Sequence, residues 1–196
     1  MKGIQWLPAP ALVTVGTIGA IGAISVLSAL STSAFAAQYA TPEEAARRCF
    51  PEATAFKDGT VQLDPDEMRA VAQTAGLPAR SALWRTMVAM KGDAPLGVVV
   101  FDAVLGKFEL IDYAVGLGND GKVRNVEILA YRESHGYEVR LPAWRRQFIG
   151  KGVDARLRVS EDIANISGAT LSSTSVTDGV RRIVAVVSTL RAHGKL

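Results

Sequence analysis

The feature that most constrains this chain is an uninterrupted apolar run near its N-terminus. From Ala11 to Leu30 there is no charged side chain, carboxamide or proline, and Lys2 is the only charged residue within 1–36. Such a run has no polar face to turn toward water, and its length matches the roughly 20 apolar residues that cross a bilayer as a helix. The folded domain must therefore be built from the residues that follow.

Small residues follow this apolar run, at the end of the N-terminal segment 1–36. Ala34 and Ala36 flank a phenylalanine in the A-x-A arrangement that signal peptidases cleave. We interpret 1–36 as an N-terminal signal or anchor helix, either a cleaved signal peptide or an uncleaved anchor that associates with the membrane through residues 11–30. Both interpretations predict a single domain over 37–196 in the periplasm or another extracytoplasmic space, free or anchored to the inner membrane.

The residue inventory excludes several classes of protein. The chain has 196 residues, which leaves room for one domain of ordinary size after the leader. Its 22 Lys and Arg against 19 Asp and Glu give a formal charge of +3, too small and too dispersed for nucleic-acid binding. A single cysteine and two histidines exclude an internal disulfide and a multi-histidine metal site. We therefore expect no metal centre and no nucleic-acid partner.

Helix start signals appear twice in the first half of the domain. Residues 41–44 and 64–67 each place an N-cap residue before a proline and two acids. They predict short helices that end near Phe50 and at Ala75, the second with Gly76 as its C-cap.

Strand patterns follow these helices. A β-branched and aromatic run begins at Gly97 and ends in a turn at 105–107. Residues 108–117 then alternate, a Gly-Asn-Asp-Gly turn occupies 118–121, and 122–130 returns as a strand. Consecutive hairpins predict an antiparallel sheet rather than the βαβ order of a dinucleotide-binding domain.

The last part of the chain predicts two more helices. Residues 142–149 form a short helix that stops at Gly150, and apolar residues recur at three- and four-residue steps over 172–192. The predicted fold is therefore α+β: an antiparallel sheet with helices packed on it, one of them a long C-terminal amphipathic helix.

Small and hydroxylated residues over 167–173 lead into this last helix. Unpaired N–H groups and the helix dipole attract anions such as phosphate to a helix start, and Gly168 and Ala169 let a phosphate approach the main chain. The hydroxyl groups available there belong to Ser167, Thr170, Ser172 and Ser173. The alternative hypothesis is that Ser172 or Ser173 serves only as the N-cap.

The Ser-Gly-Ala-Thr sequence at 167–170, ahead of an amphipathic helix, resembles the flavinylation motif of the FMN-binding domain family. That family includes subunits of the sodium-translocating NADH:quinone reductase and of the related Rnf electron-transport complex. The resemblance covers about 97–190, and three further segments follow that family's order: 118–123, 132–136 and 147–151. It implies FMN as the cofactor, joined through its phosphate to the hydroxyl of Thr170 by a flavin transferase.

The resemblance implies an electron-carrying flavoprotein with a membrane or periplasmic redox partner, rather than an enzyme whose side chains transform a substrate. No catalytic residue is therefore assigned. The flavin ring needs an apolar slot with a few hydrogen bonds, which we expect in the 131–137 loop and around Trp144. In that loop His135, beside Glu133, is a candidate to hydrogen-bond or exchange a proton with the flavin, or else an exposed loop histidine.

Two positions depart from the family's pattern. The aspartate that precedes the flavinylated threonine by six residues is replaced by Ala164, with Asp162 and Asn165 nearby. The loop at 133–138 differs from the Glu-Thr-Pro-Gly-Leu-Gly loop of the ion-pumping subunits and is more similar to that of small stand-alone FMN-binding proteins. Ala164 favours an alternative hypothesis, an exported binding, sensor or assembly module of this fold without covalent flavin.

Overall fold

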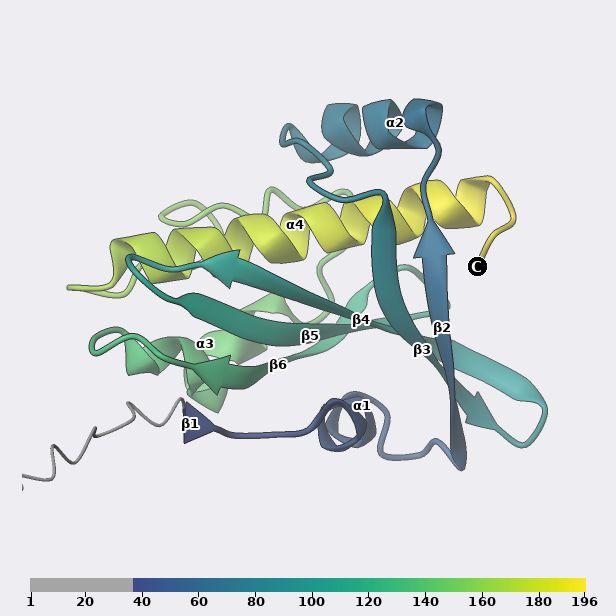
Figure 1. Ribbon diagram of the computed structural model, residues 1–196, viewed down its shortest axis with the longest axis horizontal. Coiled ribbons are helices and arrows are strands. Elements are labelled where there is room, and N and C mark those ends of the chain that lie inside the picture. Colours follow the sequence, from purple (N-terminus) through teal and green to yellow (C-terminus); the bar gives the residue numbers. More distant parts are fainter. Residues whose placement is uncertain (1–36) are drawn as a thin grey trace, which may run out of the picture. The chain divides into compact units, whose positions relative to one another are not determined.

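A six-stranded antiparallel sheet forms the centre of the computed structural model, which describes residues 37–196 (Figure 1). Its strand order is β1-β6-β5-β4-β3-β2, so every strand from β2 onward lies beside its neighbour in sequence. The strands are β1 (Ala37–Gln38), β2 (Ala55–Gln62), β3 (Leu83–Lys91), β4 (Ala94–Leu105), β5 (Leu110–Gly118) and β6 (Val123–Tyr131). The predicted antiparallel sheet is thus confirmed.

Four α-helices and two short 3-10 turns accompany the sheet within 37–196. They are α1 (Pro42–Cys49), α2 (Pro65–Ala75), α3 (Pro142–Arg145) and α4 (Thr170–Ala192), with η1 (Tyr137–Arg140) and η2 (Arg146–Phe148) on either side of α3. The first two begin where the sequence predicts, because each has a complete capping box. At α1, Thr41 Oγ1 accepts from the N–H of Glu44 at 3.2 Å, and Glu44 Oε2 accepts from the N–H of Thr41 at 2.8 Å.

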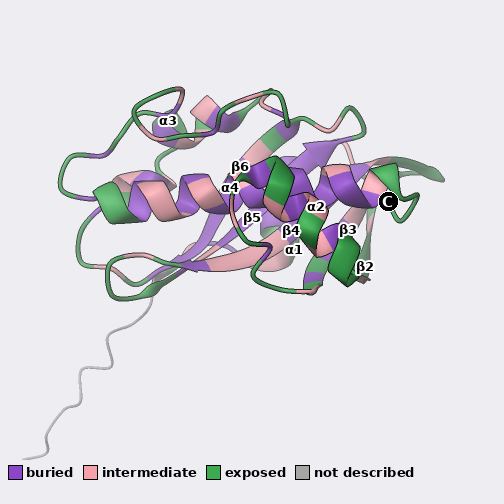
Figure 2. Cartoon of the chain, turned by 90° about the horizontal axis from the view of Figure 1, so that it is seen from above, coloured by how far each residue is buried: buried purple, intermediate pink, exposed green. Residues whose placement is uncertain are grey.

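The helices cover both faces of the sheet (Figure 1). The C-terminal helix α4 lies across β4 and β5 with α2 packed on it, and α1 lies on the opposite face against β4, β5 and β6. Figure 2 shows buried residues along most of α4. Strand β5 serves both layers, since Tyr113 and Val115 belong to the core under α4 and Ala114 to the core under α1.

Close packing of α1 depends on a glycine in β5. A Cβ atom at Gly116 would lie 2.6 Å from the Cβ of Cys49, so only glycine lets the helix approach this closely. Burial raises the pKa of the Cys49 thiol to about 12, which keeps it protonated. This cysteine is therefore a packing residue.

Three strands that the sequence analysis did not predict precede Gly97: the two-residue β1 and the longer β2 and β3. Strand β2 is an edge strand whose residues are mostly exposed, and its polar sequence carries no apolar alternation. Strand β3 does alternate in part, over Leu83–Thr86, where Trp84 and Thr86 are buried and the residues before each of them are exposed. Its partners β2 and β4 supply the pairing that its own short pattern only suggests.

The C-terminal helix also begins earlier than predicted, at Thr170 rather than Ser172. The predicted helix over 142–149 is instead the short α3 followed by the η2 turn. The predicted signal or anchor helix over 1–36 lies outside the described residues. Among the residues that are described, no helix combines the length and apolar character needed to cross a bilayer.

Candidate functional site

A cavity of about 330 Å³ lies where α4 begins. Its wall combines the turn between β4 and β5, the loop after β6 and the first turn of α4, three segments that are distant in sequence. The lining residues are Lys107, Phe108, Glu133, Ser134, His135, Gly168, Ala169, Thr170, Leu171 and Ser172. This volume falls at the lower end of the range of ligand sites in proteins. The fold thus brings together the two segments that the sequence analysis singled out.

The start of α4 has no side-chain cap. Ala169 occupies the N-cap position, and Thr170 is the first residue of the helix. Neither Ser172 nor Ser173 is the N-cap, in contrast to the alternative hypothesis, because both lie inside the first turn and are buried. An uncapped helix start leaves N–H groups available to an anion, and the helix dipole adds to that attraction.

Thr170 is exposed at the cavity wall, and within residues 37–196 its hydroxyl oxygen accepts one hydrogen bond. Nδ2 of Asn165 donates to Oγ1 of Thr170 at 3.2 Å. The hydroxyl of Ser173 donates to Oδ1 of Asn165 at 3.0 Å and lies 3.0 Å from the carbonyl oxygen of Thr170. Ser173 therefore contacts the threonine's backbone and its Asn165 partner. Like Ser167, it does not line the cavity.

The loop after β6 is held against this helix start by Tyr131. Its hydroxyl donates to the carbonyl oxygen of His135 and lies 3.4 Å from Oγ of Ser172. Burial raises the pKa of Tyr131, so the hydroxyl stays protonated and can donate. Gly136, with φ of 82°, packs so closely that an added Cβ would lie 2.7 Å from the Tyr131 hydroxyl and would also clash with Cβ of Ala169.

Glu133 lines the cavity but directs its carboxylate to the backbone of the neighbouring turn. Its Oε1 accepts from the N–H groups of Phe108 at 2.6 Å and Glu109 at 3.1 Å. His135 is exposed on the same wall, and both hypotheses about its role, flavin contact and exposed loop residue, remain compatible with this position.

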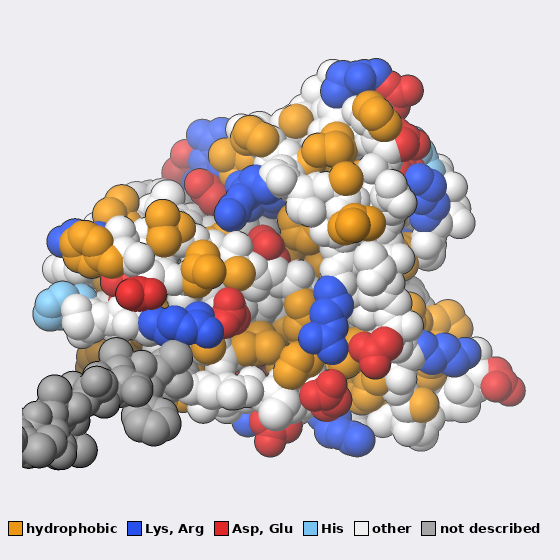
Figure 3. Space-filling model, viewed as in Figure 1, with side chains coloured by type: hydrophobic (Ala, Val, Ile, Leu, Met, Phe, Trp, Pro, Cys, Tyr) orange, Lys and Arg blue, Asp and Glu red, His pale blue; other side chains and the backbone are white. Residues whose placement is uncertain are grey.

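Four lining residues were not named by sequence reasoning: Lys107, Phe108, Ser134 and Leu171. Phe108 is 72% exposed and Leu171 is 55% exposed, which is unusual for large apolar side chains beside a cavity. Figure 3 shows hydrophobic side chains at the surface of the end where α4 begins. An aromatic residue directly after a Gly-Lys turn is the signal that could have identified Phe108, which was instead assigned to the strand.

Trp144, expected near the flavin slot, does not line the cavity. It is buried, packs edge-on against Phe148 with ring centroids 5.1 Å apart, and donates from Nε1 to the carbonyl oxygen of Ala164 at 2.8 Å. Its contact is therefore with the backbone that precedes the Ser-Gly-Ala-Thr sequence.

The acid nearest in sequence to the missing motif aspartate is used elsewhere. The carboxylate of Asp162 accepts from Nζ of Lys151 at 3.0 Å and from the N–H groups of Leu157 and Arg158 at 3.1 and 2.8 Å. Burial raises the pKa of Asp162, but these hydrogen bonds outweigh it and leave the pKa below its usual value. Asp162 organises its own loop and makes no hydrogen bond to Thr170 in the described part of the chain.

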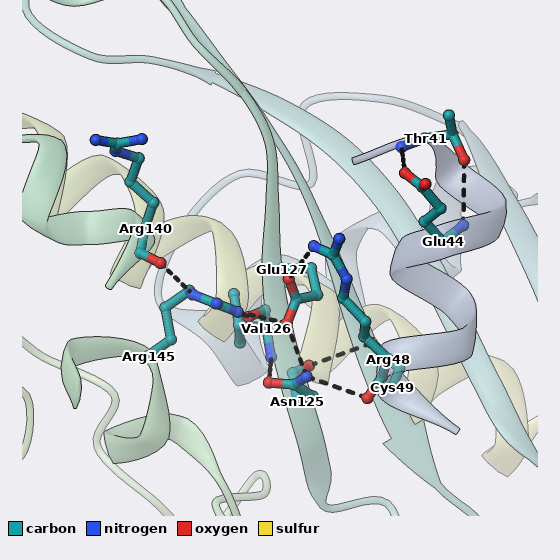
Figure 4. Close-up of polar contacts among 9 residues, drawn as sticks. All are labelled: Thr41, Glu44, Arg48, Cys49, Asn125, Val126, Glu127, Arg140 and Arg145. Atoms are coloured by element: carbon teal, nitrogen blue, oxygen red, sulfur yellow. Dashed lines mark hydrogen bonds and ion pairs between the residues drawn. The ribbon is translucent and has the colours of Figure 1, made fainter. Parts of the chain in front are cut away.

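A buried ion pair anchors the segment that follows the cavity loop (Figure 4). Nη1 of Arg145 lies 2.6 Å from Oε1 of Glu127, and its Nε donates to the carbonyl oxygen of Arg140 at 2.9 Å. The Glu127 carboxylate also accepts from Nη1 of Arg48 at 3.4 Å and from Nδ2 of Asn125 at 2.9 Å. This network joins β6 to η1, α3 and α1.

A larger cavity, of about 440 Å³, lies between α2, α4 and the segment around 152–158. None of the predicted site residues lines it, and Arg156 in its wall already pairs with Glu161 at 2.7 Å. We therefore place the candidate site at the smaller cavity, where Thr170 and the loop after β6 meet.

The uncapped helix start, the exposed threonine and the adjoining apolar side chains suit a cofactor with an anionic group and a flat apolar portion. Residues 106–185 match the model of the FMN-binding domain family, so the predicted resemblance is confirmed. FMN fits the site, since the helix start offers donors for its phosphate and Gly168, with φ of 78° and nothing within 4 Å of an added Cβ, leaves space for it.

Two solved structures resemble the chain weakly. NqrC of Shewanella oneidensis is 16% identical, with 74% of this chain and 88% of that chain covered and a TM-score of 0.46. One subunit of the Na⁺-translocating NADH-quinone reductase from Parabacteroides distasonis is 14% identical, with 80% and 83% covered and a TM-score of 0.43. No curated protein matches the chain.

Proposed function

We propose that this chain is an exported electron carrier whose FMN is joined to Thr170 through a phosphoester. The observation that carries this proposal is the place of one residue: Thr170 ends the Ser-Gly-Ala-Thr sequence, begins α4 and lies exposed at the cavity wall. Covalent attachment would retain the cofactor in a compartment where lost flavin is not replaced.

The residues of the site divide between the two ends of FMN. The first-turn N–H groups of α4 would stabilise the phosphate, with the Lys107 ammonium group at the same cavity. The exposed side chains of Phe108 and Leu171 would cover part of the ring, and His135, which lines the same cavity, would hydrogen-bond its polar edge. When bound, FMN supplies the redox chemistry, and the protein sets its exposure and the nearby charges.

Attachment requires a partner, a flavin transferase. The hydroxyl oxygen of Thr170 would attack the phosphorus of an FMN unit held in a diphosphate such as FAD. The new O–P bond then forms as the bond to the departing nucleoside monophosphate breaks, and the hydroxyl proton passes to a base of the transferase. The chain itself needs to supply only an accessible hydroxyl, which agrees with the exposure of Thr170.

Export and partnership complete the proposal. The uncharged run at 11–30 and the A-x-A sequence before Ala37 support a location outside the cytoplasm, with a membrane or periplasmic redox partner. The mass of the chain isolated from soluble and membrane fractions tests this part. A chain of full length in the cytosol would contradict it.

The test of covalent attachment is the intact mass of the full chain co-expressed with a flavin transferase. We expect one FMN phosphoester on the wild-type chain, none on Thr170→Ala, and one on Thr174→Ala, a matched control one turn further along α4. An adduct that survives Thr170→Ala would exclude this site, and an unmodified wild-type chain would exclude covalent attachment.

The second candidate is a sensor or assembly module of the same fold that holds flavin loosely or not at all. Ala164 favours it, because no carboxylate stands at the motif position and Asp162 is bonded to its own loop. The side chain at 164 is exposed, so Ala164→Asp tests the point without disturbing the core. If the wild-type protein is colourless and this variant becomes flavinylated, the second candidate describes the natural chain.

A further inference from the structure

We propose that Asn165 is the positioning residue for Thr170, holding the threonine hydroxyl for modification and the ester oxygen afterwards. This inference rests on the proposed attachment of FMN at Thr170. It starts from the hydrogen bond from Nδ2 of Asn165 to Oγ1 of Thr170, at 3.2 Å.

The backbone that carries Asn165 is fixed on both sides. The N–H of Ala164 donates to Oε1 of Gln147 at 2.8 Å, and its carbonyl oxygen accepts from Nε1 of Trp144 at 2.8 Å. The flanking side chains of Ile163 and Ile166 are buried in the core under α4. An exposed asparagine on such a tethered segment has little freedom to leave Thr170.

The amide of Asn165 is also oriented from its other end. The hydroxyl of Ser173, which is fully buried, donates to Oδ1 of Asn165 at 3.0 Å. The same Ser173 oxygen lies 3.0 Å from the carbonyl oxygen of Thr170, so its one proton has two acceptors. When Oδ1 of Asn165 takes that proton, Nδ2 faces Thr170 and acts as the donor.

A donor at this position suits both states of Thr170. An NH₂ group cannot accept the hydroxyl proton, so this proton stays free for a base of the transferase. After esterification the oxygen has no proton but keeps lone pairs, so it can still accept from Nδ2. A carboxylate in the same place would lose that contact and would repel the phosphate.

The experiment measures initial rates of FMN transfer to the purified full chain by intact mass, with transferase and FAD, over a range of chain concentrations. Asn165→Ala removes the contact, and Asn165→Asp keeps the shape and the acceptor for Ser173 but removes the donor. The control is Glu161→Gln, which changes an exposed-loop acid that pairs with Arg156 and Arg158 and has no bond to Thr170. Thermal unfolding of each variant monitors the fold.

We expect both Asn165 variants to lower kcat about tenfold, the usual value of one hydrogen bond to a reacting group, with KM within about twofold of the wild type. The control should change neither constant. Unchanged kcat in both variants, while the wild type is modified, would overturn the role of Asn165 and leave the proposed function standing. A loss confined to KM would assign Asn165 to transferase recognition instead. An unmodified wild type would overturn the attachment itself, and this inference with it.

Discussion

The carboxylate of Glu133 accepts a hydrogen bond of 2.6 Å from the backbone N–H of Phe108. This contact joins the loop after β6 to the turn between β4 and β5, and so closes the cavity wall opposite the start of α4. Glu133, which the sequence analysis assigned to the flavin site, therefore binds the turn that carries the exposed ring of Phe108.

Replacing Glu133 with alanine should loosen the turn that carries Phe108. We expect a loss of about 1 kcal/mol in the free energy of unfolding, because the turn N–H groups are near water, and a several-fold weaker affinity for FMN. Urea denaturation and titration of FMN into the unmodified chain check the two effects. Glu133→Gln, which keeps one acceptor oxygen, should retain most of both, and an FMN affinity that does not respond to Glu133→Ala would show that the turn does not contribute to binding.

Substitution of Gly136 by alanine should lower the free energy of unfolding by more than the strain of a positive φ alone would. Gly136 and Gly150 both have positive φ, 82° and 79°, but only at Gly136 would an added Cβ meet other atoms, those of Tyr131 and Ala169. We expect Gly150→Ala to lose about 1 kcal/mol and Gly136→Ala about 2–4 kcal/mol, with reduced FMN loading. Urea denaturation measures both losses. Equal losses of stability in the two variants would indicate that the loop after β6 moves to accommodate the new methyl group at 136.

Removing the carboxylate of Glu127 should destabilise the protein strongly. The Glu127 and Arg145 side chains are only 6% and 11% exposed, so Glu127→Ala leaves a guanidinium group in the interior without its partner. We expect a loss of about 3–5 kcal/mol in the free energy of unfolding. The exposed pair of Arg156 and Glu161 provides the control, since Arg156→Ala should leave the free energy of unfolding almost unchanged. A small loss for Glu127→Ala would mean that water reaches Arg145.

Acid stability should depend on Glu67. Its carboxylate accepts from Nζ of Lys195 at 2.7 Å and the N–H of Asp64 at 2.8 Å, with Nδ1 of His193 also 2.8 Å away, and these contacts lower its pKa from 4.5 to about 2. Because the folded state binds this proton less tightly than the unfolded state, the stabilisation is complete above about pH 4.5 and is lost as the pH falls toward 2.

The matching test replaces Glu67 with glutamine. The variant should be less stable than the wild type at pH 7, and the difference should shrink between pH 4.5 and 2, as followed by urea denaturation at each pH. Glu43→Gln, at an exposed acid in the first turn of α1, is the matched substitution measured in parallel. If the stability difference between the wild type and Glu67→Gln stayed constant with pH, the carboxylate charge would not be what stabilises the fold.

Capping and turn residues were sufficient to predict where α1 and α2 begin and where β5 turns into β6. The capping boxes at Thr41 and Asp64 act within four residues, and the two helices begin where these residues predict. The turn at 118–121 likewise joins β5 to β6 as expected. The edge strand β2 was not predictable in this way, because its order comes from pairing with β3 across the α2 connection and its side chains are largely exposed.

The sequence by itself determined the resemblance to the FMN-binding domain family and the candidate attachment residue, since the Ser-Gly-Ala-Thr sequence is four consecutive residues that end at the first residue of α4. Only the tertiary structure decided what surrounds Thr170. Phe108 comes from the turn between β4 and β5, and Glu133, from the loop after β6, binds the backbone of that turn through its carboxylate. The same holds for the segment before the motif, where Trp144 tethers Ala164 and leaves Asn165 beside the threonine hydroxyl. Periodicity and capping report contacts between near neighbours, whereas a cavity wall depends on how distant segments pack.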